Sequence, residues 1–187
     1  MDDEKRFQVA NLFRFPGKII ENYKIGDIQF DLDRYSVQLE KFNSFNWNSI
    51  GDNKFPSKIF ADAKDGLVLY YEDIAVAVIF FKKQFLRNKI DVTQIQSFEI
   101  NKSTDEKVEF TTDNFYINGF KWGNVLIKLL ENYFILKKYD EIIIHSTNNN
   151  IWEKMHRTDR GYDRYDKVAL DMGYIRNYDS NYTKSLK

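Results

Sequence analysis

The segment Asn124–Lys138 constrains the fold most, because its apolar side chains recur at helical spacing on one face and its polar side chains lie opposite. Strand-like runs stand on both sides of it. Asp91–Ile100 precedes it, and Glu141–His145 follows as a short apolar run of the kind found in buried parallel strands. This order predicts a βαβ unit, in which the helix packs on a sheet that holds both strands.

The remaining chain adds more strand signals. Leu67–Tyr71 and Ile74–Phe81 are β-branched and aromatic, and together they predict a β-hairpin. Lys24–Leu32 alternates and predicts a strand, and Val108–Thr112 predicts a short extra strand. Asp33–Phe45 places aromatic and aliphatic residues near helical spacing, so we expect a helix there.

The run Asp91–Ile100 does not alternate cleanly. Val92, Phe98 and Ile100 share one face of a regular strand, whereas Ile95 falls on the other. Two explanations remain open. A β-bulge would shift the face by one residue, and a central strand would be buried on both sides.

The last part of the chain repeats the alternation of helix and strand. Tyr165–Met172 predicts a short helix, and Gly173 stands where a glycine C-cap belongs. Tyr174–Ile175 and Tyr182–Leu186 predict short closing strands. We therefore expect a single α/β domain over residues 1–187, with a mixed, twisted sheet and helices on both of its faces.

Composition narrows the class of protein. The 187 residues carry 28 basic and 28 acidic side chains, so a nucleic-acid partner is disfavoured because polyanion binders usually have a basic excess. The absence of Cys excludes disulfides and thiolate chemistry. The longest apolar run, Ile74–Phe81, is far shorter than the roughly 20 residues of a membrane helix. The N-terminus is charged and leads into no long apolar run, so we expect a soluble, cytoplasmic protein without a membrane partner.

A glycine-bearing segment, Asn118–Asn124, precedes the central helix. It holds Gly119, Lys121 and Gly123. Converging backbone N–H groups at a helix N-terminus bind phosphate well, and a nearby cation helps. Glycines before a helix also serve as ordinary turn residues, so the motif alone leaves both interpretations open.

In context, the order of elements over Leu67–Leu186 resembles that of the GNAT family (GCN5-related N-acetyltransferases). Residues 67–187 thus resemble the core of the family, whereas the pattern of residues 1–66 is hard to interpret. The family's helix often reads like "ALLKALEEY", and Val125–Tyr133 (VLIKLLENY) is similar to it. The closing Ala169–Tyr174 (ALDMGY) is similar to the family's last helix and Gly-aromatic pair. Tyr182–Leu186 looks like its final strand.

The resemblance implies transfer of an acyl group, most simply acetyl, from acyl-CoA to an amine on a small molecule or a peptide. It also suggests a homodimer, because dimers are common in the family. The cofactor-binding residues that it implies are Phe98, Ile100, Asn118, Gly119, Phe120, Lys121, Trp122, Gly123, Asn124 and Asn149.

Two residues are candidates for proton transfer. Glu99 lies on the strand expected to flank the acyl group, and its carboxylate can act as a base, although a solvated or cross-strand-paired role is the alternative. Tyr165 can donate a proton to the leaving thiolate, or simply pack in the core. His145 and His156 do not match a metal-binding spacing, so no metal is expected.

The sequence differs from the family pattern at positions that have functional roles in the family. Lys121 stands at the first motif glycine, and Ala169 stands where many members have the tyrosine proton donor. Residues 103–117 and 151–162 look like insertions. A non-catalytic binding or interaction module of the same fold therefore remains the alternative to an acyltransferase.

Overall fold

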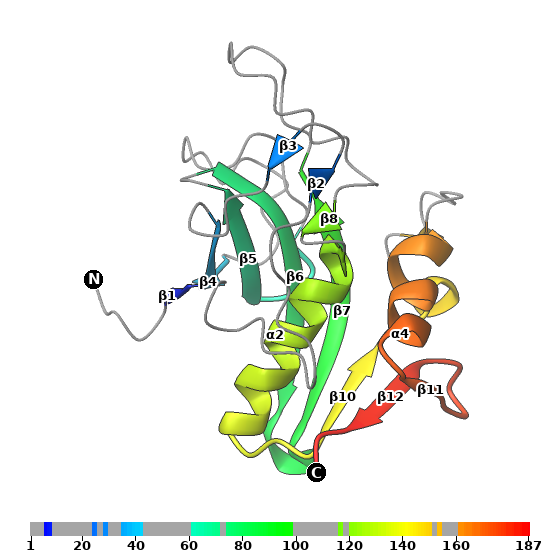
Figure 1. The fold of residues 1–187 in the computed structure, drawn as a ribbon. Coiled ribbons are helices and arrows are strands. Elements are labelled where there is room, and N and C mark those ends of the chain that lie inside the picture. The colour runs from blue at the N-terminus through cyan, green and yellow to red at the C-terminus, as the bar shows by residue number, and fades with distance from the viewer. Residues whose placement is uncertain are drawn as a thin grey trace.

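An eight-stranded mixed sheet forms the centre of the protein (Figure 1). The computed structural model describes residues 6–8, 24–25, 28–29, 35–42, 61–71, 74–98, 116–117, 120–150, 153–154 and 161–187, and only the backbone of 6–8, 24–25, 28–29, 35–36, 116–117 and 120. In spatial order the strands are β1 (Arg6–Gln8), β4 (Tyr35–Lys41), β5 (Asp65–Tyr71), β6 (Ile74–Gln84), β7 (Lys89–Ser97), β10 (Glu141–Ile144), β12 (Tyr182–Ser185) and β11 (Ile175–Arg176). Only β7 and β10 pair in parallel; the other neighbours are antiparallel.

Two short hairpins and the helical segments complete the description. The hairpins are β2 (Lys24–Ile25) with β3 (Ile28–Gln29), and β8 (Tyr116–Ile117) with β9 (Phe120–Lys121). The helical segments are η3 (Phe85–Arg87), α2 (Trp122–Leu136), η4 (Thr147–Asn149), the π-helical turn η5 (Tyr162–Asp166) and α4 (Lys167–Asp171).

The predicted βαβ unit is present. The chain leaves β7, later forms α2, and returns through β10, which runs parallel to β7 beside it (Figure 1). The predicted hairpin corresponds to β5 and β6, and the predicted closing strands correspond to β11 and β12. The mixed α/β class is therefore confirmed.

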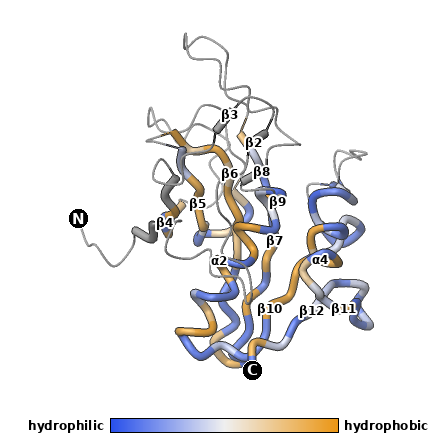
Figure 2. Tube along the Cα trace, viewed as in Figure 1, coloured by the Kyte–Doolittle hydropathy of each residue, from blue (hydrophilic) through white to orange (hydrophobic). Residues whose placement is uncertain are grey.

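The main core lies between the sheet and the two helices. Apolar side chains of α2 and α4 form one cluster with inward-facing residues of β5, β6, β7 and β10, among them Leu126, Phe134, Val168, Ile79 and Ile142. Figure 2 shows hydrophobic residues concentrated on these strands. Each fully buried side chain of this size stabilises the fold by about 1.5–3 kcal/mol. In the described part of the chain both helices cover this one face, so helices on the second face stay a prediction.

Strand β7 contains a β-bulge. Its pairing with β6 skips a residue, because Phe80 faces Gln94 whereas Phe81 faces Val92, so Thr93 is the extra residue. The bulge brings Ile95 onto the same face as Val92, and both join the main core. Phe98 then lies on the opposite face, in a second cluster with Phe80. Both explanations of the irregular pattern thus hold, since the strand is bulged and buried on both sides.

The helix expected over Asp33–Phe45 is wrong. The structure forms strand β4 at Tyr35–Lys41, which pairs with β5 along its whole length. The residues Tyr35, Val37 and Leu39 alternate with polar ones, and this period-two pattern decides the structure. The strand expected over Lys24–Leu32 is instead the small hairpin of β2 and β3. The strand expected at Val108–Thr112 lies outside the described residues.

The helix boundaries differ slightly from the prediction. Helix α2 begins at Trp122, so Gly123 lies within its first turn rather than in a preceding loop. The last helical segment begins earlier than expected, with η5 at Tyr162. Gly173 follows α4 with a φ of 78°, which confirms the glycine cap, because the left-handed conformation favours glycine.

A buried carboxylate ties α2 to the last part of the sheet. Glu131 of α2 is 1% exposed and accepts a hydrogen bond from Lys184 Nζ of β12 at 2.9 Å. Lys128 Nζ, one turn away on α2, lies 3.2 Å from the other carboxylate oxygen. Two cations thus compensate one buried negative charge, which would otherwise cost several kcal/mol.

We predict that Gly66→Ala destabilises the protein. A Cβ at this position of β5 would lie 2.5 Å from Cε2 of Phe42, whose ring packs edge-on against Phe80 in the second cluster. Overpacking of this kind costs about 1–3 kcal/mol, measurable by urea unfolding. The double variant Gly66→Ala/Phe42→Leu serves as the control. It should lose less stability than the sum of the two single variants, and strict additivity would contradict the steric cause.

Candidate functional site

The two parallel strands at the centre of the sheet separate part of the way along their length. Strands β7 and β10 pair from Lys89 and Glu141 to Val92 and Ile144. Their last contact is the hydrogen bond from His145 N to Val92 O, at 3.1 Å. Beyond this hydrogen bond, β7 continues to Ser97, whereas the segment that follows β10 turns into η4. We call the edge of β7 beyond Val92, where β10 no longer pairs with it, the strand gap.

Side chains replace the missing strand along the strand gap. The side-chain amide of Asn150 donates to Thr93 O at 2.7 Å, and Ile95 N donates to the hydroxyl of Tyr165 at 3.4 Å. The Thr93 bulge produces this arrangement, because the extra residue turns the Ile95 N–H toward the gap while Phe98 N still donates to Val76 O of β6. The edge therefore offers one N–H and one C=O whose partners are side chains.

Tyr165 fills the strand gap from the helical side. It belongs to the π-helical turn η5, is 2% exposed, and packs in the main core. Burial raises the pKa of its hydroxyl above the ordinary value of 10, so the group stays protonated. Among the described residues the hydroxyl only accepts a hydrogen bond, from Ile95 N, so its own hydrogen can be donated to a ligand.

Within the described residues, the N-terminus of α2 carries no side-chain cap. Lys121 occupies the cap position with no cap hydrogen bond from its side chain, and the first turn contains no acidic residue. Such an end attracts anions through its partial positive charge. The Lys121 ammonium donates to Asp163 O at 3.0 Å, which ties this end of α2 to η5.

Gly123 has a packing role. A Cβ at this position would lie 3.1 Å from a methyl group of Val168, so the missing side chain lets α4 approach α2 closely. Val168 and Tyr165 lie three residues apart on the same helical run. The close approach at Gly123 therefore helps to place Tyr165 at the strand gap.

Some of the predicted site residues have a described position. Phe98 is buried in the second core cluster, and its backbone N–H is used by β6. Trp122 is 2% exposed in the main core, and the buried Oδ1 atom of Asn124 has no hydrogen-bond partner among the described residues. Asn149 donates to Asp179 O at 2.6 Å and to Asn181 Oδ1 at 2.9 Å, so its amide faces the β11–β12 loop. Its neighbour Asn150 is the asparagine that reaches the strand gap.

The remaining predicted residues are not placed. Glu99, Ile100, Asn118 and Gly119 lie outside the described residues, and of Phe120 only the backbone in β9 is described. The roles suggested for them therefore stay predictions.

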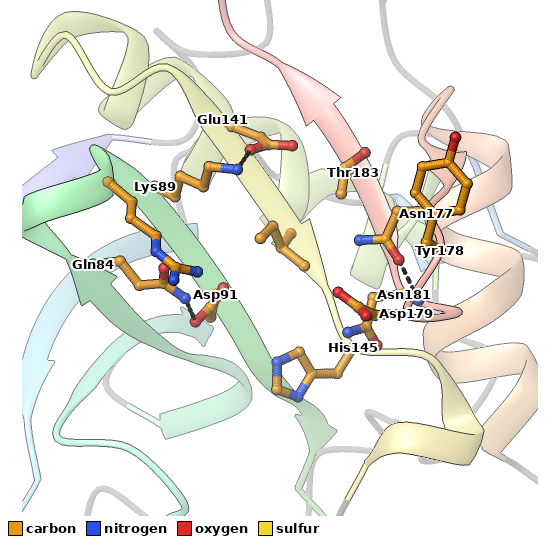
Figure 3. Close-up of a pocket in the computed structure, with 12 residues that line it drawn as sticks. Gln84, Lys89, Asp91, Glu141, His145, Asn177, Tyr178, Asp179, Asn181 and Thr183 are labelled. Carbon is orange, nitrogen blue, oxygen red and sulfur yellow. Dashed lines mark hydrogen bonds and ion pairs between the residues drawn. The ribbon is translucent and has the colours of Figure 1, made fainter.

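A groove of about 400 Å³ lies on the face of the sheet opposite α2 (Figure 3). Alternate residues of β7, β10 and β12 form its floor, because their neighbours Ile90, Ile142 and Ile144 point into the main core. Its lining consists of Gln84, Arg87, Lys89, Asp91, Glu141, Ile143, His145, Asn177, Tyr178, Asp179, Asn181 and Thr183. We call it the open-face groove.

His145 joins the open-face groove to the strand gap. Its backbone N–H makes the last contact between β7 and β10, and its imidazole faces the groove (Figure 3). Burial lowers the pKa of His145 below 6.5, although Asp91 and Asp62 oppose the shift. The imidazole is thus neutral at pH 7 and able to accept a proton.

Asp62 is a further candidate that the sequence did not reveal. It precedes β5 and accepts a hydrogen bond from Thr93 Oγ1 at 2.6 Å, at the bulge. Burial raises its pKa, and this hydrogen bond opposes the shift. A perturbed carboxylate close to a histidine is typical of functional sites. No motif surrounds Asp62, and only the pairing of distant strands brings it here.

The described residues lack two kinds of feature. No group of three or more His, Asp or Glu side chains there is arranged to hold a metal ion. No described helix is both long and apolar enough to cross a bilayer.

Comparison with known proteins identifies no family. No family model matches the sequence, and no curated protein matches it. Seven chains of solved structures match. One is from the crystal structure of Tetrahymena GCN5, which is 12% identical, with 66% of this chain and 68% of that chain covered and a TM-score of 0.35. At this TM-score the likeness establishes neither the fold family nor the activity.

We predict that His145 makes stability fall at mildly acidic pH. Its folded-state pKa is depressed, so the unfolded chain binds the proton first, and stability present above pH 6.5 is lost as the pH falls through the folded pKa. Urea unfolding of the wild type and His145→Gln between pH 8 and pH 5 should show a steeper loss for the wild type. If the free energy of unfolding of the two proteins changed in parallel with pH, the lowered pKa of His145 would be contradicted.

Proposed function

We propose that the protein is an acyl-CoA-dependent N-acyltransferase, most simply an acetyltransferase, that acts on an amine. The observation that carries this proposal is the strand gap, where Ile95 N–H and Thr93 C=O are bonded to side chains instead of a neighbouring strand. A linear ligand with amide groups can bind such an edge as an added strand does. The pantetheine arm of CoA has this chemistry.

The residues around the strand gap fit the proposed cofactor. The Ile95 N–H would polarise the thioester carbonyl, a role that mutagenesis elsewhere values at about 10²–10³ in rate for one donor. The bond that now occupies this N–H is 3.4 Å long and therefore weak, so a ligand can displace it. The uncapped N-terminus of α2, with Lys121 beside it, would hold the pyrophosphate. The bound thioester supplies the activated acyl group.

Tyr165 is positioned to assist the departure of the thiolate. Its protonated hydroxyl lies at the strand gap, and its raised pKa makes it a hydrogen-bond donor rather than a strong acid. Glu99, one of the two predicted proton-transfer residues, lies outside the described residues and stays a prediction as the base, and His145 is the alternative base among the described residues.

One observation favours a second candidate function. Tyr165 and Asn150 already provide partners for two buried backbone groups of β7, Ile95 N–H and Thr93 C=O, so these two groups do not require a ligand. A non-catalytic binding or interaction module of the same fold would have this property.

We predict that acetyl-CoA stabilises the protein and that CoA is released in the presence of a suitable amine. At a concentration 100-fold above Kd the gain is about 2.7 kcal/mol, or a rise in Tm of about 5 °C or more for a chain of this size. Thermal unfolding with and without acetyl-CoA measures the stabilisation. An assay of CoA release over a panel of amines measures the turnover. The absence of stabilisation at millimolar acetyl-CoA would exclude the proposed function.

The variant Tyr165→Phe separates catalysis from binding. We expect it to keep the stabilisation by acetyl-CoA and to lower kcat by about 10²-fold, because only the hydrogen-bond donor is removed. An unchanged kcat would assign Tyr165 to packing alone, and stabilisation without turnover by the wild type would favour the non-catalytic module.

A further inference from the structure

The open-face groove contains charged groups that are already paired with one another. Lys89 forms an ion pair with Glu141, and the side-chain amide of Gln84 donates to Asp91 (Figure 3). These contacts hold the side chains of β6, β7 and β10 in place across the floor of the groove. The charges of Lys89 and Glu141 cancel, whereas Asp91 keeps its negative charge because its partner Gln84 is neutral.

Three other groups in the groove are not engaged. In the described part of the chain, the side chains of Arg87, His145 and Asp179 form no hydrogen bond and no ion pair, although all three line the groove. Arg87 follows β6 at the end of the groove where Lys89 and Glu141 pair. His145 follows β10 and Asp179 lies in the β11–β12 loop, and the pairing of Ile144 with Tyr182 places both segments at the other end of the groove. By chain position, Arg87 thus lines one end of the groove, and Asp179 and His145 line the other.

From this arrangement we propose that the open-face groove binds a short zwitterionic peptide, with its amine at His145 and Asp179 and its carboxylate on Arg87. A planar guanidinium is well suited to a carboxylate, and the Asp179 carboxylate attracts an ammonium group. From the level of Lys89 to that of His145 the groove extends over about four strand residues, or about 13 Å. Asn177 and Thr183 also line this path, and their side chains already bond to Asn181 N and Ile175 O.

Charges from all sides face the amine end. Asp91 of β7 and Asp62 before β5 are negative, whereas Lys82 of β6 and Lys154 are positive. Asp179 of the β11–β12 loop adds a further negative charge at the surface. A primary ammonium group is therefore attracted to this end, and the neutral imidazole of His145 can take its proton.

The catalytic part of this inference rests on the proposed function. The amine end of the groove lies where β7 and β10 separate, because His145 N makes their last contact. There the ammonium gives one proton to His145, and the amine forms a C–N bond with the acyl carbon as the C–S bond breaks. The thiolate leaves with the electron pair and takes the second proton from the nitrogen. The products are the amide, the free thiol and protonated His145.

Glycine peptides of about two to four residues test the binding directly, without any cofactor. Titration followed by NMR compares each peptide with its C-terminal amide, which lacks the carboxylate, and with its N-acetyl form, which lacks the amine. We expect the free peptide to bind about three- to tenfold more tightly than either blocked form. Arg87→Gln should abolish the preference over the amide, and Asp179→Asn should reduce the preference over the N-acetyl form.

Lys137→Gln is the matched control, because it removes an exposed positive charge outside the groove. It should leave both preferences unchanged. Preferences that persist in Arg87→Gln and Asp179→Asn, or no saturable binding of any peptide at millimolar concentration, would overturn the proposal.

Stabilisation by acetyl-CoA is measured separately on the wild type and Arg87→Gln. It distinguishes a failure of the proposed acyltransferase function from a failure of the proposed peptide site. Peptide binding without stabilisation would refute the acyltransferase and leave the groove assignment intact. Stabilisation without peptide binding would refute the groove assignment alone.

Discussion

The separation of two parallel strands after Val92 is the constraint on which the rest of the site depends. A buried strand edge must find partners for its backbone groups, since each unpaired group costs about 1–3 kcal/mol. Here Asn150 and Tyr165 provide those partners from segments that follow β10. The positions of η4, η5 and α4 are therefore linked to the edge of β7. Gly123 completes this arrangement, because it allows α4 to lie close against α2.

The same separation connects the two faces of the sheet. On the helical face it leaves the strand gap, into which Tyr165 projects from the main core. On the other face it ends at His145, which belongs to the open-face groove. A single point in the sheet thus brings together an amide edge, a protonated hydroxyl and a neutral imidazole. An acyl donor and an amine approaching from opposite faces would meet there.

Local pattern predicted the βαβ unit, the β5–β6 hairpin and the Gly173 cap, because each has a strong signal in neighbouring residues. It failed at Tyr35–Lys41, where three residues near helical spacing outweighed a clear alternation. Three consecutive asparagines carry no signal of direction, so the sequence alone could not show that Asn150, the neighbour of the predicted Asn149, contacts the edge of β7. Asp62 and the groove depend on strand register across distant segments, which periodicity cannot reveal.

The buried Glu131 has a consequence for the order in which the chain acquires its structure. Helix α2 is synthesised more than forty residues before Lys184, the cation that neutralises this carboxylate from β12. Until then only Lys128 on the same helix can compensate the charge. We therefore expect α2 to pack less stably against the sheet until β12 has been synthesised, so the last strand would complete the core as well as close the sheet.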